Sequence, residues 1–371
     1  MPRSKHYSAS WFSVASCFLI LCAMAAALEG HGQQAKTDSI QQADTDSITV
    51  KRLGHGPLIT VNSSATLAGN VNGPVLIRVP DWIKKPLGNY YLYFANHKGK
   101  FIRLAYADAI TGPWKIYEPG VLRVEETAFT RPDTATDTAA LYTHVASPDI
   151  YIDPTTRKII LFAHGMWTDG QPWPTNLNGA EAQHWLSERG YEQYSQAFES
   201  TDGIHFTPHT AITKSSYLRV FRYGDSFYSI SRLGRVGHSA DPFGEFNLAQ
   251  SLFQETPYAG HVRHVALLRR GDTLHVFFTV IGAAPEQVLH AKVDLTVPWQ
   301  QWKAVHPADV LTSERSYECA NLPVSPSRSG DIDEPVHQLR DPGIFEEGGH
   351  TYLLYSTCGE QGIALAEIHL Q

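Results

Sequence analysis

Short strands rich in aromatic residues, separated by Gly and Pro turns, recur along this chain, and this recurrence constrains the fold more than any other feature. In the last copy, residues 338–356, an Arg-Asp-Pro step precedes an apolar run, and Glu-Gly-Gly supplies the turn into a Tyr-rich strand. Residues 362–368 alternate apolar and polar side chains, which predicts a third strand. Three antiparallel strands leave one sheet edge open, and an unpaired edge favours aggregation.

Four earlier units show the same pattern, and each offers four strands. They open at Asn72, Ser147, Tyr217 and Val262. In each unit an aromatic residue after a Gly or Pro turn marks the fourth strand. The predicted fourth strands are residues 111–117, 202–206, 241–246 and 298–302. The last unit has only three strands, and residues 48–60 can supply the missing one.

Five four-stranded sheets arranged around an axis form a five-bladed β-propeller. We therefore expect an all-β fold, a five-bladed β-propeller closed by an N-terminal strand. A β-sandwich also uses many short strands, but it gives no reason for a fivefold recurrence.

The first 47 residues are predicted to lie outside the propeller. Two basic residues precede an apolar run, and small residues near position 27 offer cleavage sites, so residues 1–27 are interpreted as a secretory signal peptide. An uncleaved membrane anchor is the alternative. Residues 28–47 are polar and predict a disordered linker, which leaves residues 48–371 as the propeller. The expected location is secreted or periplasmic, without membrane attachment after cleavage.

Net charge and residue content limit the partners, disulfides and cofactors that the chain can have. A net charge of −7 argues against nucleic acid as a partner. Once the signal peptide is removed, only Cys319 and Cys358 remain, and they are either one disulfide or two buried thiols. The sequence carries no Gly-rich phosphate loop and no clustered Cys/His metal set, so we expect no cofactor.

Three segments carry a resemblance to a known group: Tyr-Tyr-Leu-Tyr-Phe, Ala-Asp-Ala-Ile-Thr-Gly-Pro-Trp and Ser-Thr-Asp-Gly-Ile-His-Phe. They resemble glycoside hydrolase family 43 and its five-bladed relatives in families 117, 32 and 130, over residues 48–371. The resemblance implies an exported, exo-acting glycoside hydrolase whose oligosaccharide or polysaccharide substrate sits in a funnel at the axis. Relatives sometimes hold a metal ion on the axis, but nothing in this sequence requires one.

The same resemblance names the residues expected to face the funnel, at the starts of the innermost strands. They are Asn72, Asp149, Arg219, Arg263, His264, Arg340 and Asp341. Asp149 stands where family 43 has a second-blade Asp that orients the substrate, and Asp341 resembles the Asp-Pro elements that carry a base. One departure is that Asn72-Gly73-Pro74 replaces the first-blade Asp-Pro that supplies the general base in family 43.

Cleavage of a glycosidic bond needs one carboxylic acid and one carboxylate. The catalytic candidates are Asp149, Asp341, Glu318 and His264. We expect Asp149 and Asp341 to face each other across the funnel at a separation that implies inversion. Asp341 would be the base, Glu318 or His264 the acid, and Asp149 would hold the sugar. The alternatives are turn or loop carboxylates and a structural histidine.

The remaining candidates would bind substrate. They are Asn72, Arg219, Arg263, Arg340, Trp167 and Trp173. Guanidinium groups suit an anionic sugar or a phosphorolytic reaction, or alternatively they pair with Asp149 and Asp341 between blades. The tryptophans belong to an insertion, residues 165–190, that would form either a sugar-stacking rim or a cap on the second blade.

Three functional classes therefore stay open: a glycoside hydrolase, a non-catalytic sugar-binding propeller and a glycoside phosphorylase.

Overall fold

The structure, a computed structural model, describes residues 48–67, 69–130, 137–138, 141–168, 173–174 and 176–370. The predicted signal peptide and linker lie outside these residues. Within the described ranges, no helix is both long enough and apolar enough to cross a membrane.

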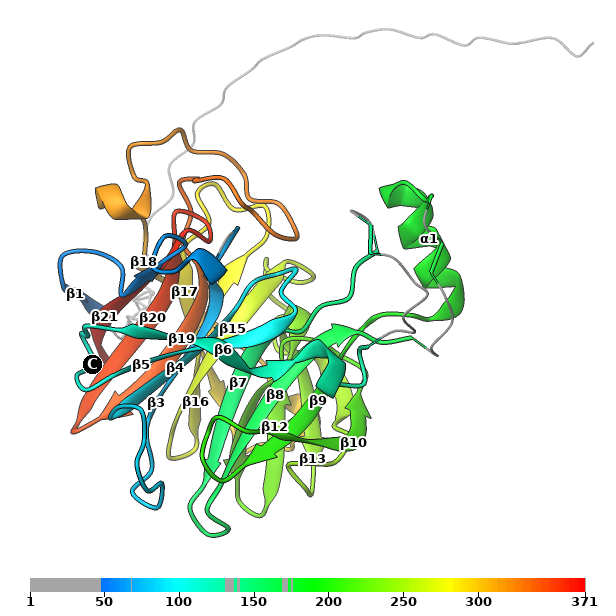
Figure 1. Cartoon of the computed structure of the whole chain (residues 1–371), viewed down its shortest axis with the longest axis horizontal. Helices are drawn as coiled ribbons and strands as arrows, with labels where there is room; N and C mark the ends of the chain where they lie inside the picture. The colour runs from blue at the N-terminus through cyan, green and yellow to red at the C-terminus, as the bar shows by residue number, and fades with distance from the viewer. Residues whose placement is uncertain are drawn as a thin grey trace, which may run out of the picture. The chain divides into compact units, whose positions relative to one another are not determined.

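Five separate antiparallel sheets make up the described chain, as the sequence predicts (Figure 1). Blade 1 contains β3 (Asn72–Arg78), β4 (Tyr90–Ala95), β5 (Phe101–Ala107) and β6 (Lys115–Arg123). Blade 2 contains β7 (Ala146–Asp153), β8 (Lys158–Met166), β9 (Gln193–Ser200) and β10 (Thr207–Thr213). Blade 3 contains β11 (Arg219–Tyr223), β12 (Ser226–Ile230), β13 (Arg235–Ser239) and β14 (Asn247–Ser251). Blade 4 contains β15 (Val262–Arg270), β16 (Thr273–Val280), β17 (Val288–Asp294) and β18 (Val305–Leu311).

The fifth blade takes strands from both ends of the described chain. It contains β19 (Arg340–Glu347), β20 (His350–Thr357), β21 (Gly362–Leu370) and β1 (Ile48–Leu53), and the short β2 (Ile59–Thr60) also pairs with β21. The register of β1 and β21 runs from Ile48 opposite Leu370 to Leu53 opposite Leu365. The innermost strands of the five blades are β3, β7, β11, β15 and β19.

The hydrophobic core is divided among the interfaces between blades because successive side chains of a strand point to opposite sheet faces. On β4, Tyr91 and Tyr93 pack toward blade 2, whereas Leu92 and Phe94 pack toward blade 5. Each of the other three interfaces has its own cluster of buried apolar side chains. This two-sided burial explains the runs of consecutive apolar residues in the second strands, such as Tyr90–Ala95 of β4 and Tyr352–Tyr355 of β20.

The fourth strands begin later than the sequence predicts. Blade 4, for example, was expected to end with residues 298–302, but its fourth strand is β18, which starts at Val305. The aromatic residue that marks each unit lies in the turn before the strand and fills the gap to a neighbouring blade. Trp302 illustrates this, since it is fully buried against Phe221 and Tyr228 of blade 3.

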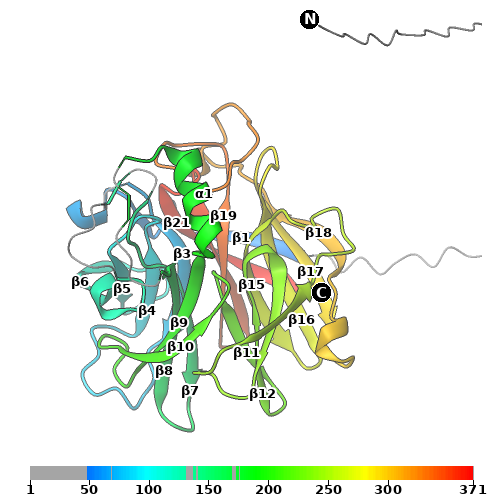
Figure 2. The ribbon, with the colours of Figure 1, turned by 90° about the vertical axis from the view of Figure 1, so that its right-hand side faces the viewer.

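Two excursions project from the same end of the propeller, the end at which the innermost strands begin (Figures 1 and 2). One carries the helix α1 (Gly179–Arg189), which is capped at its start by the Asn178 side chain and at its end by Gly190 in a left-handed conformation. The other is the connection from β18 to β19, residues 312–339, which we call the mouth loop.

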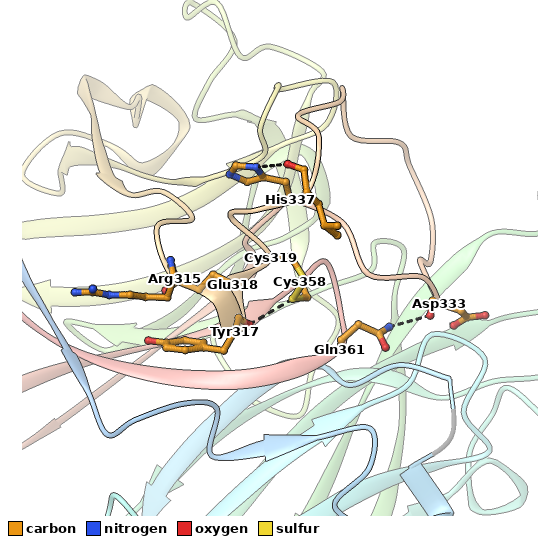
Figure 3. Close-up of a disulfide and its surroundings, with 9 residues drawn as sticks. Arg315, Tyr317, Glu318, Cys319, Asp333, His337, Cys358 and Gln361 are labelled. Atoms are coloured by element: carbon orange, nitrogen blue, oxygen red, sulfur yellow. Dashed lines mark hydrogen bonds between the residues drawn. A yellow bond between two sulfur atoms is a disulfide. The ribbon is translucent and has the colours of Figure 1, made fainter.

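The mouth loop is fastened to the fifth blade by a covalent bond. Cys319 and Cys358 form a disulfide that joins the loop to the turn between β20 and β21 (Figure 3). The Gln361 side chain in the same turn donates a hydrogen bond of 3.0 Å to the carbonyl oxygen of Asp333. The sequence left this pairing open between a disulfide and two thiols.

We expect replacement of both cysteines by alanine to lower the free energy of unfolding by about 2–4 kcal/mol, because the crosslink restricts the unfolded chain. Chemical denaturation of the wild-type and variant proteins measures the difference. A reducing agent should destabilise the wild type to the same extent and leave the variant unchanged. Equal unfolding midpoints for oxidised wild type and variant would contradict a stabilising bridge.

Candidate functional site

The innermost strands share a local backbone feature at the funnel end. Gly73, Ser147, Tyr217 and Asp341 have φ values of 58°, 48°, 59° and 49°, and each lies just before or at the start of its strand. In blades 1, 2 and 5 the pairing of the first two strands is irregular at this point. A left-handed conformation costs about 1–3 kcal/mol for a residue other than glycine, and such strain gathers at functional sites. These four residues therefore occupy one layer, which we call the bulge layer.

Asp341 and His264 form a buried pair in this layer. The Nδ1 atom of His264 bonds to Oδ1 of Asp341, and Ser356 donates to Oδ2 of Asp341 at 3.3 Å. The other ring nitrogen of His264, Nε2, is buried and has no hydrogen-bond partner among the described residues. A carboxylate that fixes one imidazole nitrogen and leaves the other without a partner is an arrangement used to position a general base.

The surroundings set the charge of each partner. Burial would raise the pKa of Asp341, but His264, His97 and Arg263 together outweigh burial and hold that pKa well below its ordinary value. Burial lowers the pKa of His264, and the Asp341 carboxylate opposes this only in part. The pair is therefore an ionised carboxylate beside a neutral imidazole at neutral pH, with Nδ1–H donating and Nε2 able to accept a proton.

Tyr217 of the bulge layer lies between two histidines. Its ring centroid is 4.2 Å from those of His264 and His164, in an edge-to-face arrangement with each. Burial raises the pKa of Tyr217 to about 12 and lowers that of His164 well below its ordinary value. These aromatic groups are neutral at physiological pH and form one wall beside His264.

The arginines expected to bind substrate instead form ion pairs within the protein. Arg263 makes two hydrogen bonds to Glu286, at 2.8 and 3.1 Å, and Arg340 lies 3.5 Å from the same carboxylate. Burial opposes the charge of Arg263, but Glu286 outweighs it and raises the pKa of Arg263. Both arginines also donate to the carbonyl oxygen of Gly330 in the mouth loop, at 3.4 and 3.3 Å.

The same network continues into blade 1. Arg340 pairs with Glu360 at 3.1 Å, and the second oxygen of Glu360 bonds to His97 at 2.8 Å and to Asn72 at 3.1 Å. Burial would lower the pKa of His97, but Glu360 reverses this and raises it. Asn72, expected to bind substrate, is 1% exposed and uses its amide within this network.

Asp149 and Arg219 lie in a different layer from Asp341. Counted from the bulge layer, both are two residues further along their strands, at the level of Val75 and Gly343. They line an axial cavity of about 150 Å³ together with these two residues. Asp149 accepts a hydrogen bond of 2.7 Å from the backbone N–H of Val220, and Arg219 is 3.5 Å from its other oxygen.

Asp149 and Asp341 thus have different partners: Asp149 bonds to Val220 and lies near Arg219, whereas Asp341 bonds to His264. The separation across the funnel that would imply inversion stays a prediction. The residue of blade 2 that corresponds to Asp341 is Ser147, because each precedes a proline at the strand start and each has positive φ. Burial raises the pKa of Asp149 despite the opposing charge of Arg219. The structure thus places Asp149 in the wall of the axial cavity, with Arg219 as its partner.

Glu318, a third catalytic candidate, is occupied by structural contacts. Arg52 of β1 donates to both of its oxygens, at 2.7 and 3.1 Å, and Tyr355 donates at 2.9 Å. The backbone N–H groups of Glu314 and Arg315 complete its shell. Burial would raise the pKa of Glu318, but Arg52 and these donors lower it. This fully bonded carboxylate joins β1 to the mouth loop, and no contact links it to Asp341 or His264.

The two tryptophans differ. Trp173 is buried at 4% exposure in a cluster with Leu186 of α1 and Tyr191, so it supports the helix and is not available for stacking on a sugar. This corrects its predicted substrate role. Trp167 is half-buried, with its ring centroid 5.6 Å from that of Tyr194.

Several site residues were missed by the sequence analysis. They are His97, His164, Tyr217, Glu286 and Glu360. One signal was available: Gly-Pro, Ser-Pro and Asp-Pro steps open three of the units and align Gly73, Ser147 and Asp341. Among the described residues, no group of three or more His, Cys, Asp or Glu side chains is arranged to hold a metal ion.

The fold places the chain in a defined class, the five-bladed β-propellers of the glycoside hydrolase family 43 type. Within that class, the chain belongs to the family of the uncharacterized protein R118 of Acanthamoeba polyphaga mimivirus. The two are 31% identical over 351 residues, which cover 88% of this chain and 92% of R118. A scan against protein-family profiles finds no match.

Solved structures share the architecture at low identity. The family 43 protein BlXynB of Bacillus licheniformis is 14% identical, with a TM-score of 0.50 over 81% of this chain and 53% of that one, so this chain spans about half its length. An α-L-arabinofuranosidase of Lactobacillus brevis is 10% identical, with a TM-score of 0.51 over 83% and 94% of the two chains. The GH43_1 enzyme of Xanthomonas citri, solved with xylose, is 10% identical, with a TM-score of 0.50 over 88% and 90%. At these identities the likeness shows the fold.

The ion pair of Arg263 and Glu286 generates a prediction about stability. We expect Arg263→Met or Glu286→Met alone to lower the free energy of unfolding by about 3–5 kcal/mol, because each leaves a buried charge uncompensated. The double variant should lose less than the sum of the two single losses. Chemical denaturation of the four proteins measures this coupling, and strictly additive losses would show that the pair is not a unit.

Proposed function

We propose that the protein is a glycoside hydrolase that acts on an oligosaccharide at the bulge layer of the funnel. The observation that carries the proposal is the Asp341–His264 pair, in which Nε2 of His264 is left without a protein partner. The family 43 fold supports it, since the Xanthomonas citri enzyme of this fold was solved with xylose.

In this proposal His264 is the general base and Asp341 positions it. Asp341 accepts a hydrogen bond from Nδ1–H and so keeps the lone pair on Nε2, which takes a proton from the attacking water. The edge of Tyr217 packs against the imidazole and restricts its orientation. This assignment exchanges the roles expected from the sequence, in which Asp341 was the base and His264 a candidate acid.

A non-catalytic sugar-binding protein is the second candidate, and one observation favours it. Glycosidases ordinarily use two carboxyl groups, yet Gly73 and Ser147 occupy the positions of the bulge layer that correspond to Asp341. Phosphorolysis has lost its support, because Arg263 and Arg340 are paired with Glu286 and Glu360.

Three finer features belong to the same proposal. Exo-action is expected if the blades close the funnel on all sides. Inversion is also expected, and NMR of the first product would show it as a change of anomeric configuration. Export is expected from the signal peptide predicted at residues 1–27.

The catalytic assignment predicts that His264→Gln and Asp341→Asn each lower kcat by about 10²–10⁴-fold, the range ordinarily contributed by general base catalysis. Release of reducing sugar from a glycan panel measures this effect, and melting temperature and sugar binding control for folding. Glu318→Gln is the contrasting variant, because it should lower stability and leave kcat unchanged. Near-normal turnover of His264→Gln on the best substrate would overturn the assignment.

The pH profile adds an independent test of the base. Because burial lowers the pKa of His264, the imidazole should stay neutral below pH 6.5, and kcat/KM should fall only under still more acidic conditions. A profile that falls as pH rises through this range would assign His264 to the acid role.

We also propose that β1 closes the ring of blades. Its support is the pairing with β21 and the contact of Arg52 with Glu318. A chain that starts at Val61 should expose the edge of β21 and lose cooperative unfolding, whereas a chain that starts at Ile48 should melt like the mature protein. Calorimetry compares the two. Identical transitions would mean that β1 is not needed for closure.

A further inference from the structure

A second cavity lies beside the funnel, between α1 and blade 3. It has a volume of about 290 Å³, which lies at the small end of the range for ligand pockets and suits a single sugar unit. One wall comes from Leu186 of α1 and from Met166 at the end of β8, and the opposite wall comes from residues 214–216 and 232–235. The capping of α1 and its buried cluster hold the first wall in place.

The charge of this cavity differs from that of the funnel. Its lining includes three cations, Lys214, Arg232 and Arg235, and one carboxylate, Glu192. None of the three cations forms an ion pair with a carboxylate of the described residues, and all three are exposed. We call this cavity the basic pocket. Funnel arginines neutralised by buried glutamates cannot attract an anion, whereas unpaired cations facing a cavity can.

Neighbouring residues of the chain contribute to the basic pocket and to the candidate active site. The N–H of Arg232 donates a hydrogen bond of 2.9 Å to the carbonyl oxygen of Ser216. Ser216 lines the pocket and directly precedes Tyr217, whose ring packs on His264. The charge of Arg232 also opposes the rise in the pKa of Tyr217.

We propose that the basic pocket binds the anionic group, a carboxylate or a sulfate, of a sugar unit adjacent to the unit held at the Asp341–His264 pair. The inference deepens the proposed function and rests on it for the placement of the second unit. It makes the substrate an acidic oligosaccharide. A planar guanidinium from Arg232 or Arg235 matches two oxygens of either group.

The test is calorimetric binding of a galacturonate trisaccharide, a sulfated galactose trisaccharide and a neutral galactose trisaccharide to the full chain. We expect at least one acidic trisaccharide to bind about tenfold or more tightly than the neutral one, with a preference that shrinks as NaCl is added. The acidic trisaccharide that binds more tightly than the neutral one identifies the anionic group, a carboxylate or a sulfate, that the pocket recognises. The variant Arg232→Gln/Arg235→Gln should lose most of the preference and keep its affinity for the neutral sugar.

The matched control is Arg157→Gln. Arg157 is exposed in the turn between β7 and β8, at the opposite end of β8 from Met166, so the variant removes one charge far from the pocket. The control should keep the full preference. Equal binding of acidic and neutral trisaccharides by the wild type, or an undiminished preference in the double variant, would overturn the proposal.

A separate readout distinguishes this inference from the proposed function. The same sugars are incubated with the wild-type protein and assayed for new reducing ends, which report cleavage. The absorbance of unsaturated uronate is followed as well, because it separates cleavage by elimination from hydrolysis. Tight, Arg232-dependent binding without hydrolysis would leave the basic pocket standing and remove the hydrolase. Hydrolysis of the neutral sugar, without tighter binding of either acidic sugar, would support the hydrolase and remove the proposed role of the basic pocket.

Discussion

The mouth of this propeller depends on one buried network of charges, in which Arg263, Glu286, Arg340 and Glu360 alternate in sign. Each carboxylate has an exposure of 0%, and such groups are tolerated only when charge and hydrogen bonds are both satisfied. Glu286 belongs to the loop after β16 and Glu360 to the turn after β20. The network therefore joins loops of blades 4 and 5, and His97 extends it to blade 1.

The network also explains how the mouth loop is held over the funnel. Arg263 and Arg340 both donate to the carbonyl oxygen of Gly330, and Arg263 also donates to that of Arg328, so these arginines hold two backbone groups of the loop. Because Asp341 directly follows Arg340, the same anchoring places the Asp341 carboxylate against His264. The position of the Asp341–His264 pair thus depends on a network of charges that lies beside it.

The architecture could be predicted from sequence because its signals are local. A strand of alternating or continuous apolar residues followed by a Gly or Pro turn identifies a blade from fewer than ten neighbouring positions. The same rule misplaced the fourth strands, since an aromatic residue such as Trp302 fills a turn as readily as it starts a strand. The N-terminal residues 48–60 were assigned to the last sheet by counting strands, and β1 does lie beside β21.

The site could be predicted only in part, because its contacts join residues that are distant in sequence. His264 and Asp341 were both candidates, but their direct contact joins positions 77 residues apart and has no local signal. Glu318 was paired in the structure with Arg52, which is 266 residues away. Asp149 was expected to face the funnel, and it lines the axial cavity. The sequence did not show that a bulge makes Ser147 the counterpart of Asp341, because the strained φ of Ser147 is not visible in a sequence that lacks glycine there.

The arginines show why charge counting by position is a weak guide to a binding site. Arg263 and Arg340 were chosen because they start inner strands, yet both are neutralised by glutamates from loops that the pattern of strands does not place. Arg232 lies in a short turn of helix, and Arg235 directly follows it. Neither was a candidate from the sequence, although no carboxylate of the described chain neutralises them. Where a cation is buried, its partner sets the stability of the fold. Where it is exposed and unpaired beside a cavity, its charge is still available to a ligand, and selectivity for an acidic sugar would reside there.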